Sequence, residues 1–349
     1  MKNSSFHSNF KLNGNSFESK EELVRYAATT PHAVFLFLRD WFSEKPTLSL
    51  TTSGSIGTPK EIELKKRHMI HSAKTTGRFF NLPENTTALL CLSADYIAGK
   101  MMLVRAMVLG WHLDIVKTDA NPLKNTSKTY DFSAMIPMQL RNSLQDIHRV
   151  KKLIVGGGAV DIDLERAIQK ISTQVFATYG MTETSTHIAV KKLNHFKNSE
   201  PSSKHYEVLP DITISKDNRS CLVIDAPKIS DTPLITNDIV EIITPTQFNW
   251  KGRCDYVINS GGIKLHPEEI ERKLAPQIKR RFFVAGMHDK LLGEKLILLI
   301  EGTEFHIPKE TYSNLNKYEI PKKIYFIPQF KETETGKIQR IKILDSIVP

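Results

Sequence analysis

Short apolar segments alternate with longer helical ones through the first half of the chain. Residues 88–92, 113–116 and 153–155 have the length and composition of buried strands, whereas residues 100–109 and 164–171 favour helices. Helices that connect successive strands pack on the faces of a largely parallel sheet. We therefore expect an α/β fold with a mostly parallel sheet flanked by helices.

From about residue 212 the pattern changes to short alternating strands at 212–214, 221–224 and 239–242, which indicate a small antiparallel region. Beyond residue 252 a hairpin, a helix and further strands form a compact α+β segment. A chain of 349 residues is long enough for two domains. We predict a large domain over residues 1–252 and a small, mobile C-terminal lid domain over residues 253–349.

The composition narrows the class of protein. The formal net charge is +10, but the positive residues are spread along the chain, without zinc-finger or RNA-binding motifs, so phosphate-rich small ligands suit them better than nucleic acid. We find no apolar run of membrane-spanning length and no signal-peptide core at the start. The three cysteines show no metal-like or redox pairing. We expect a cytoplasmic protein that does not insert into membranes.

A run of glycines and hydroxyl residues lies between residues 51 and 60. Backbone N–H groups beside glycine, hydroxyl groups and a closing lysine are suited to phosphate oxygens. Glu61 follows Lys60 where a Walker A loop has Ser or Thr, so the run is not that motif. A plain turn is the alternative. The candidate phosphate-binding residues are Thr52, Ser53, Gly54, Ser55, Gly57 and Lys60.

A second candidate segment, residues 178–184, follows a predicted strand, where open α/β sheets bind ligands. Tyr179 can stack on a nucleobase, Thr182 can bond a phosphate and Glu183 can bind magnesium. The alternative is a helix start with Tyr179 in the core.

Two further segments contain charged residues beside glycine. Asp238 and Arg253 could bind the hydroxyl groups and phosphates of a nucleotide, and Lys337, in a glycine turn, could stabilise developing negative charge. Taken singly, each is more often part of a solvated turn.

In this order the segments resemble the adenylate-forming superfamily of acyl-CoA synthetases, peptide-synthetase adenylation domains and luciferases. The matches cover the chain from residue 50 to its end. They comprise T-S-G-T-T-G-x-P-K at 52–60, Y-G-x-T-E at 179–183, T-G-D at 236–238, G-R-x-D-x-x-I at 252–258 and P-K…G-K-x-x-R at 321–340.

The resemblance implies two half-reactions, in which a carboxylate attacks the α-phosphate of ATP and coenzyme A then displaces AMP. ATP, Mg²⁺ and coenzyme A are the implied cofactor and co-substrates. The implied roles are catalysis by Lys337, Thr182 and Glu183, magnesium binding by Glu183, nucleotide binding by Gly157, Gly158, Tyr179, Gly180, Met181, Asp238 and Arg253, a hinge at Asp255, and a coenzyme A tunnel at Gly261 and Gly262.

A narrower resemblance is to the o-succinylbenzoate–CoA ligases of menaquinone biosynthesis. Residues 156–159 and 260–262 are similar to their G-G-G-x and S-G-G runs, and Arg105 follows Gly99 by the six residues of their helix motif, although Tyr96 replaces its histidine. An arginine in an apolar helix is costly unless paired, and a dicarboxylic acid would supply the partner. The alternative is an Arg105 that reaches the surface or pairs with a protein carboxylate.

Some departures leave other functions open. Asn237 replaces a glycine, and the region before residue 52 is short for the superfamily. The alternatives are a ligase for another aryl or fatty acid, an adenylation domain that loads a carrier protein, and an inactive nucleotide-binding protein. The expected partners are a carboxylic acid, ATP and coenzyme A rather than nucleic acid, and a homodimer stays open.

Overall fold

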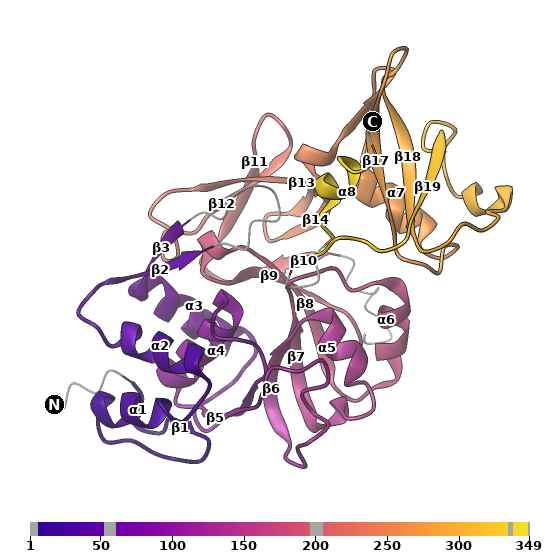
Figure 1. Ribbon diagram of the computed structural model, residues 1–349. Coiled ribbons are helices and arrows are strands. Elements are labelled where there is room, and N and C mark those ends of the chain that lie inside the picture. Colours follow the sequence, from indigo (N-terminus) through magenta and orange to yellow (C-terminus); the bar gives the residue numbers. More distant parts are fainter. Residues whose placement is uncertain (1–5, 52–60, 196–204, 334–337, 348–349) are drawn as a thin grey trace. The chain divides into compact units, whose positions relative to one another are not determined.

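The computed structural model describes residues 6–51, 61–195, 205–333 and 338–347, in two compact units (Figure 1). Among these residues, the first unit holds those up to Thr213 together with Asp225–Leu234. The second holds Ile214–Ile224 and those from Ile235 onward. The second unit thus includes strands on the N-terminal side of residue 252, and the boundary between 252 and 253 stays a prediction.

The sheet of the first unit is mostly parallel, as expected. Parallel pairing joins β1 to β5, β5 to β4, β4 to β6, β6 to β7 and β7 to β8, and only β9 and β10 add antiparallel neighbours at one end. The strands lie in the order β1 (Lys11–Leu12), β5 (His112–Ile115), β4 (Thr87–Leu90), β6 (Tyr130–Met135), β7 (Val150–Val155), β8 (Gln174–Gly180), β9 (His187–Lys192) and β10 (Tyr206–Val208).

Helices cover both faces of this sheet (Figure 1). Because successive side chains of a strand point to opposite faces, Leu90 packs into one core cluster and Leu89 into the other. The first cluster includes side chains of α1 (Lys20–Ala27), α2 (His32–Trp41), α3 (Lys66–Phe79) and α4 (Ile97–Leu109). The second includes side chains of α5 (Pro137–Asn142), η1 (Ile147–Arg149), α6 (Ile162–Ala167) and η2 (Ile168–Lys170).

The expected helix start near residue 19 is confirmed. The Oγ of Ser19 accepts a hydrogen bond from the backbone N–H of Glu22 at 3.1 Å and caps α1. Strands β2 (Thr47–Thr51) and β3 (Glu61–Lys65) pair antiparallel, and Leu48, Leu50 and Leu64 add to the first cluster. The predicted phosphate loop, which connects them, lies outside the described residues.

The first four strands of this part of the chain lie side by side. Their order in the sheet is β14 (Gln247–Arg253), β13 (Leu234–Thr244), β12 (Cys221–Asp225) and β11 (Thr213–Lys216). The pairing of β13 with β14 is antiparallel, as expected for this part of the chain.

Two helices sandwich the other sheet of the second unit. On β18, Leu298 packs with Ile270 of α7 (Pro267–Leu274), whereas Leu299 packs with Ile343 of α8 (Arg340–Leu344) on the opposite face. The strands are β16 (Ile263–Leu265), β15 (Ile258–Ser260), β18 (Gly293–Glu301), β17 (Phe282–Asp289) and β19 (Lys323–Ile327), with short η4 (Cys254–Tyr256) and η5 (Lys309–Tyr312) turns.

The predicted fold class is therefore confirmed: a large α/β part with a mostly parallel sheet precedes a small α+β part with its own core. The helix predicted over 164–171 forms as α6 followed by the separate turn η2, because the chain tightens after Ala167. Within the described part of the chain, none of the helices has the length and apolar character needed to cross a bilayer.

Candidate functional site

The carboxyl ends of the parallel strands bring several of the predicted residues to one edge of the first sheet. β7 ends at Val155, directly before the triple glycine, and β8 ends at Gly180. Parallel neighbours end at the same edge, which is where open α/β sheets bind ligands. The predicted phosphate-contacting Gly157 and Gly158 and the predicted nucleobase contact Tyr179 therefore lie at a common edge.

The triple glycine has a specific backbone requirement. Gly157 has a φ of +82°, which residues with a side chain rarely adopt. A Cβ on Gly156 would lie 2.6 Å from the Oγ1 of Thr178, whose hydroxyl donates to the carbonyl of Val155 at 3.2 Å. Gly157 and Gly158 are themselves exposed. Their backbone N–H groups are thus accessible to a ligand oxygen.

The residues after Tyr179 form a tight connection from β8 to β9. A Cβ on Gly180 would lie 2.3 Å from the carbonyl oxygen of Thr186, so only glycine fits this close approach. The backbone N–H of Met181 donates to the Oγ1 of Thr184 at 3.0 Å within the turn η3 (Thr182–Thr184). The connection is a single turn rather than a helix start.

The side chains with predicted roles differ in exposure. Thr182 and Tyr179 are half-buried, and Glu183 is exposed. The Tyr179 ring lies 5.9 Å from that of Tyr206 at an interplanar angle of 61°, an edge-to-face arrangement that fixes its orientation. Glu183 is thus the accessible carboxylate of this turn.

Arg105 of α4 is 1% exposed, which excludes the surface-reaching alternative. Its Nη2 donates to the Oγ1 of Thr186 at 2.8 Å, and its Nε contacts the Oγ1 of Thr76 at 3.4 Å. Its Nη1 approaches the Sδ of Met102 at 3.7 Å. Burial lowers the pKa of Arg105 from 12.5 to about 9. No carboxylate of the described residues forms an ion pair with this guanidinium.

His187, the first residue of β9, is the neighbour of Arg105 that the sequence reasoning missed. It is 5% exposed, and its Nδ1 lies 3.3 Å from the Oγ1 of Thr186. Its Nε2 has no hydrogen-bond partner among the described residues. Burial, reinforced by the charge of Arg105, lowers the pKa of His187 well below 6.5. The signal in the sequence was a polar residue directly before the apolar run Ile188–Val190.

The other two residues predicted to line the acyl pocket flank the start of α4. Tyr96 is the N-cap residue and is 36% exposed. A Cβ on Gly99 would lie 2.2 Å from the carbonyl oxygen of Ser93. Gly99 therefore lets the helix pack against the preceding loop, and contact with a substrate stays a prediction for both residues.

In the second unit, Asp238 and Arg253 are directly opposite each other on β13 and β14. The indole Nε1 of Trp250 donates to Asp238 at 3.0 Å. Arg253 pairs with Asp255, the predicted hinge residue. Burial opposes the charge of Arg253, but this pairing and the charge of Asp238 raise its pKa. The structure thus brings together the two residues predicted to bind the ribose.

The same unit contains a largely buried ion pair, with 19% and 17% of the two side chains exposed. Arg340 of α8 donates from Nη1 and Nη2 to the two carboxylate oxygens of Glu271 at 2.8 Å each. Its guanidinium also lies 5.4 Å from the ring of Tyr256 and 5.3 Å from that of Phe283. In the sequence, Arg340 was only the last residue of a motif. In the structure, its ion pair links α8 to α7.

The predicted coenzyme A residues Gly261 and Gly262 form the two-residue turn between β15 and β16. Their φ angles are +59° and +83°, as a type I′ hairpin turn requires. The backbone angles of the turn therefore explain why both residues are glycine. Contact with coenzyme A stays a prediction.

Some predicted residues lie outside the described residues. The flanks of Lys337 are described: Ile338 bridges to Glu332, and the backbone N–H of Gln339 donates to the carbonyl of Lys331 at 2.8 Å. The undescribed candidates are Thr52, Ser53, Gly54, Ser55, Gly57, Lys60 and Lys337.

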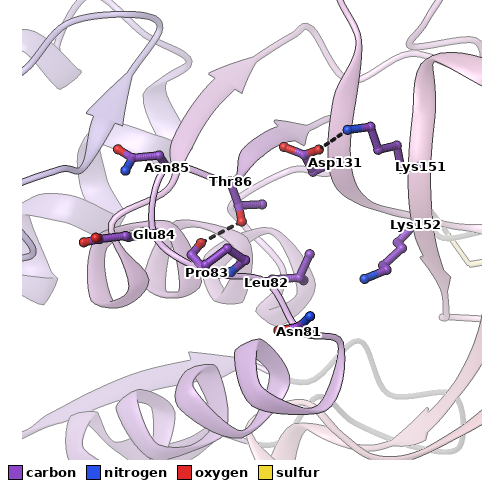
Figure 2. A pocket seen from close by; sticks show the side chains of 9 residues that line it. All are labelled: Asn81, Leu82, Pro83, Glu84, Asn85, Thr86, Asp131, Lys151 and Lys152. Carbon is purple, nitrogen blue, oxygen red and sulfur yellow. Dashed lines mark hydrogen bonds and ion pairs between the residues drawn. The ribbon is translucent and has the colours of Figure 1, made fainter.

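A separate pocket of about 230 Å³ lies at the opposite edge of the first sheet (Figure 2). Its walls include the starts of β6 and β7 and residues 81–86. The Nζ of Lys151 donates to Asp131 at 2.8 Å, and the Nζ of Lys152 donates to the carbonyl of Phe80 at 2.6 Å. Its cations are thus engaged within the protein, and it is distinct from the predicted site.

Comparisons with known proteins identify the family of the chain. The family model for AMP-binding enzyme matches residues 43–227, slightly more than half of the chain. The 2-succinylbenzoate–CoA ligase of Haemophilus influenzae is 24% identical over 290 residues, which cover 78% of this chain and 62% of that protein. The enzyme of the same name from Staphylococcus epidermidis is 25% identical over 325 residues, or 84% of this chain and 68% of that one.

Two solved structures are also similar. An acyl-CoA synthetase (AMP-forming)/AMP-acid ligase II-like protein from Dyadobacter fermentans is 36% identical, with a TM-score of 0.60, over 90% of this chain and 94% of that chain. The o-succinylbenzoate coenzyme A synthetase of Bacillus subtilis, in complex with ATP and magnesium, is 19% identical with a TM-score of 0.72, over 84% of this chain and 69% of that chain, and it shows the likeness of fold. The family match and the shared architecture establish the resemblance read from the motifs, and this chain belongs to the AMP-binding enzyme family.

Proposed function

We propose that this protein is an ATP-dependent acid–CoA ligase that activates 2-succinylbenzoate, or a closely similar dicarboxylic acid, as its acyl-adenylate. The acyl group then passes to the thiol of coenzyme A, with release of AMP and pyrophosphate. In this proposal the enzyme acts in the cytoplasm, in menaquinone biosynthesis.

The observation that carries the choice of substrate is the environment of Arg105. Among the described residues, this guanidinium, which is 1% exposed, has only the neutral partners Thr186, Thr76 and Met102, and none of them compensates its charge. A carboxylate is the anion whose geometry matches the planar guanidinium. A dicarboxylic acid offers one carboxylate for reaction and a second for Arg105, whereas a monocarboxylic acid leaves the arginine unpaired.

The residues at the sheet edge also suit ATP and magnesium. The exposed backbone of Gly157 and Gly158 offers N–H donors to phosphate, and Tyr179 offers a ring face to adenine. Magnesium that arrives on phosphates needs only one or two protein carboxylates, a requirement that the exposed Glu183 meets. Bound magnesium would neutralise charge on the phosphates. Thr182 then contacts the phosphate, and Asp238 and Arg253 bind the ribose.

Both half-reactions need positioning and charge stabilisation rather than a protein nucleophile. Lys337 stabilises the negative charge that develops at the α-phosphate in the first step. Asp255 is the proposed hinge between the two steps, and Gly261 and Gly262 line the route of coenzyme A.

The relatives named 2-succinylbenzoate–CoA ligase support this substrate, although their identities of 24% and 25% do not by themselves identify it. The chain spans 62% of the length of the first of them, so the activity of the whole protein is part of the proposal.

The deciding experiment is an ATP-dependent thioester assay with coenzyme A and 2-succinylbenzoate, compared with benzoate and octanoate. We expect AMP release and thioester formation with 2-succinylbenzoate at a kcat/KM well above that of either monocarboxylic acid. A preference for octanoate would make the protein a different acid ligase. Pyrophosphate release with no AMP release or thioester formation on addition of coenzyme A would indicate an adenylation domain that loads a carrier protein. No turnover despite ATP binding would indicate an inactive nucleotide-binding protein.

A further inference from the structure

The hydroxyl group of Thr186 lies between two buried side chains, and its single proton constrains the histidine beside it. Arg105 can only donate hydrogen bonds, so the Oγ1 of Thr186 accepts from Nη2 at 2.8 Å. The same Oγ1 lies 3.3 Å from the Nδ1 of His187. The hydroxyl proton therefore has one acceptor within the described contacts, the lone pair of that nitrogen.

The number of hydrogen bonds that each tautomer of His187 would lose shows which tautomer is present. If the Nδ1 carried the proton, the Thr186 hydroxyl proton and the Nε2 lone pair would both be left unbonded in a buried environment. If the Nε2 carries the proton, only that N–H is left without a partner. The second arrangement loses fewer hydrogen bonds, so His187 is neutral and carries its proton on Nε2.

The imidazole has little freedom to turn this donor elsewhere. His187 is 5% exposed, and the Phe80 ring lies 6.3 Å away in an edge-to-face arrangement. Burial and the charge of Arg105 both disfavour a second proton, and both lower the pKa of His187. A buried N–H without a partner is rare in native proteins and indicates a missing acceptor.

We propose that the Nε2–H of His187 is a second donor to the non-reacting carboxylate of the acid substrate, beside the guanidinium of Arg105. This inference rests on the proposed dicarboxylic acid and assigns a specificity-determining residue to it. The Nη2 of Arg105 and the Nδ1 of His187 both contact the Oγ1 of Thr186, at 2.8 and 3.3 Å, so the two side chains are neighbours. Each carboxylate oxygen can accept more than one bond, so one carboxylate can satisfy both.

The test compares two substitutions at one position. His187→Gln keeps an N–H donor at a similar distance from the backbone, whereas His187→Leu keeps the volume and removes the donor. His112→Leu is the matched control, because His112 on β5 also has a buried Nε2 without a partner but no contact with Arg105 among the described residues. The substrates are 2-succinylbenzoate and the two monoacids obtained when either carboxyl group is replaced by hydrogen.

We expect His187→Leu to raise the KM for 2-succinylbenzoate roughly tenfold to a hundredfold, with a small change in kcat, because the lost bond is to a charged group. The KM of the monoacid that retains the reacting carboxylate should change little, and His187→Gln should restore most of the affinity for the diacid. An equal loss for diacid and monoacid would show a purely structural role and overturn the proposal, as would an unchanged KM for the diacid.

The proposed function is tested separately, by the activity of the wild-type protein. If the wild type forms no thioester from any of these acids, the ligase proposal is wrong. Calorimetric titration of the wild type and of His187→Leu with 2-succinylbenzoate then tests the donor alone, and equal affinities overturn it.

Discussion

Arg105 is fully buried and Arg340 is largely buried, with 19% of its side chain exposed; each lies in a different compact unit, and their partners differ in charge. Arg340 has bidentate bonds to the carboxylate of Glu271 and lies against two aromatic rings. Among the described residues, Arg105 has hydrogen-bond contacts only with two threonine hydroxyl groups and the thioether sulfur of Met102. Because a buried charge is costly without a counter-charge, the partner of Arg340 is a protein carboxylate, whereas for Arg105 we propose a carboxylate of the substrate.

The largest expected effect tests the paired arginine. Glu271→Leu removes the bidentate partner of the largely buried guanidinium of Arg340, and we expect it to lower the free energy of unfolding by about 3 to 5 kcal/mol. Urea denaturation of the full chain measures this. The double substitution Glu271→Leu with Arg340→Leu should recover much of the loss, because the guanidinium that lost its bidentate partner is then removed as well. If the single and double variants are equally destabilised, the pair is not what holds α8 to α7.

The next effect tests the unpaired arginine. Arg105→Met removes a buried charge that has no counter-charge among the described residues, so the free energy of unfolding should stay the same or rise. The affinity for 2-succinylbenzoate should fall by about 3 kcal/mol, roughly a hundredfold, because a buried charge pair with the ligand is lost. Steady-state kinetics and urea denaturation of the same variant give both numbers. A variant that is strongly destabilised, with unchanged substrate affinity, would make Arg105 structural and remove the contrast with Arg340.

Ligand-dependent stability sharpens the same contrast. At a concentration of one hundred times its Kd, 2-succinylbenzoate should stabilise the wild type by about 2.7 kcal/mol against unfolding. Arg105→Met should show almost none of this stabilisation at the same concentration. Arg166→Ala, which removes an exposed pair with Asp163 on α6, serves as the control and should respond as the wild type does. Equal stabilisation of all three proteins would place the acid away from Arg105.

The smallest expected effect concerns His187, the neutral base beside Arg105. Burial, with the charge of Arg105, lowers the pKa of His187 well below 6.5, so below that pH the unfolded chain binds a proton that the folded chain does not. The stability contributed by neutral His187 is therefore present above pH 6.5 and is lost as the pH falls below it. His187→Gln does not titrate there.

Between pH 6.5 and 5.5 the wild type should lose about 1 kcal/mol more unfolding free energy than His187→Gln. Urea denaturation at both pH values measures the difference, and the other histidines contribute equally to the two proteins. Parallel pH profiles would mean that His187 titrates normally and is not buried beside a cation.

Much of the architecture followed from local patterns. Alternating apolar segments predicted the parallel sheet, and the change of pattern near residue 212 predicted the strands that form as β11, β12 and β13, whereas β14, which pairs antiparallel with β13, was not predicted. The Ser19 cap of α1 was also predictable, since a cap depends on residues three apart. The exact ends of α6 were not, because the tightening into η2 depends on how the chain packs against the sheet.

The candidate site divides in the same way. The order of the motifs identified the family, and it placed Tyr179, Thr182 and Glu183 at the carboxyl end of a strand. It gave no role to His187, because an isolated histidine at the start of a strand has no pattern that separates a ligand contact from core packing. It left the partner of Arg105 open, because an arginine on an apolar helix can pair with any carboxylate that the fold brings near.

The sequence by itself therefore determined the fold class, the family and the nature of the residues at the predicted site, since these depend on short motifs and on the periodicity of strands and helices. Only the tertiary structure decided which buried charge has a protein partner. Glu271 and Arg340 meet across 69 residues of chain, and Arg105 and Thr186 across 81. The free energy of a buried charge depends on what lies within a few ångströms of it, and that is set by packing rather than by neighbours in the chain.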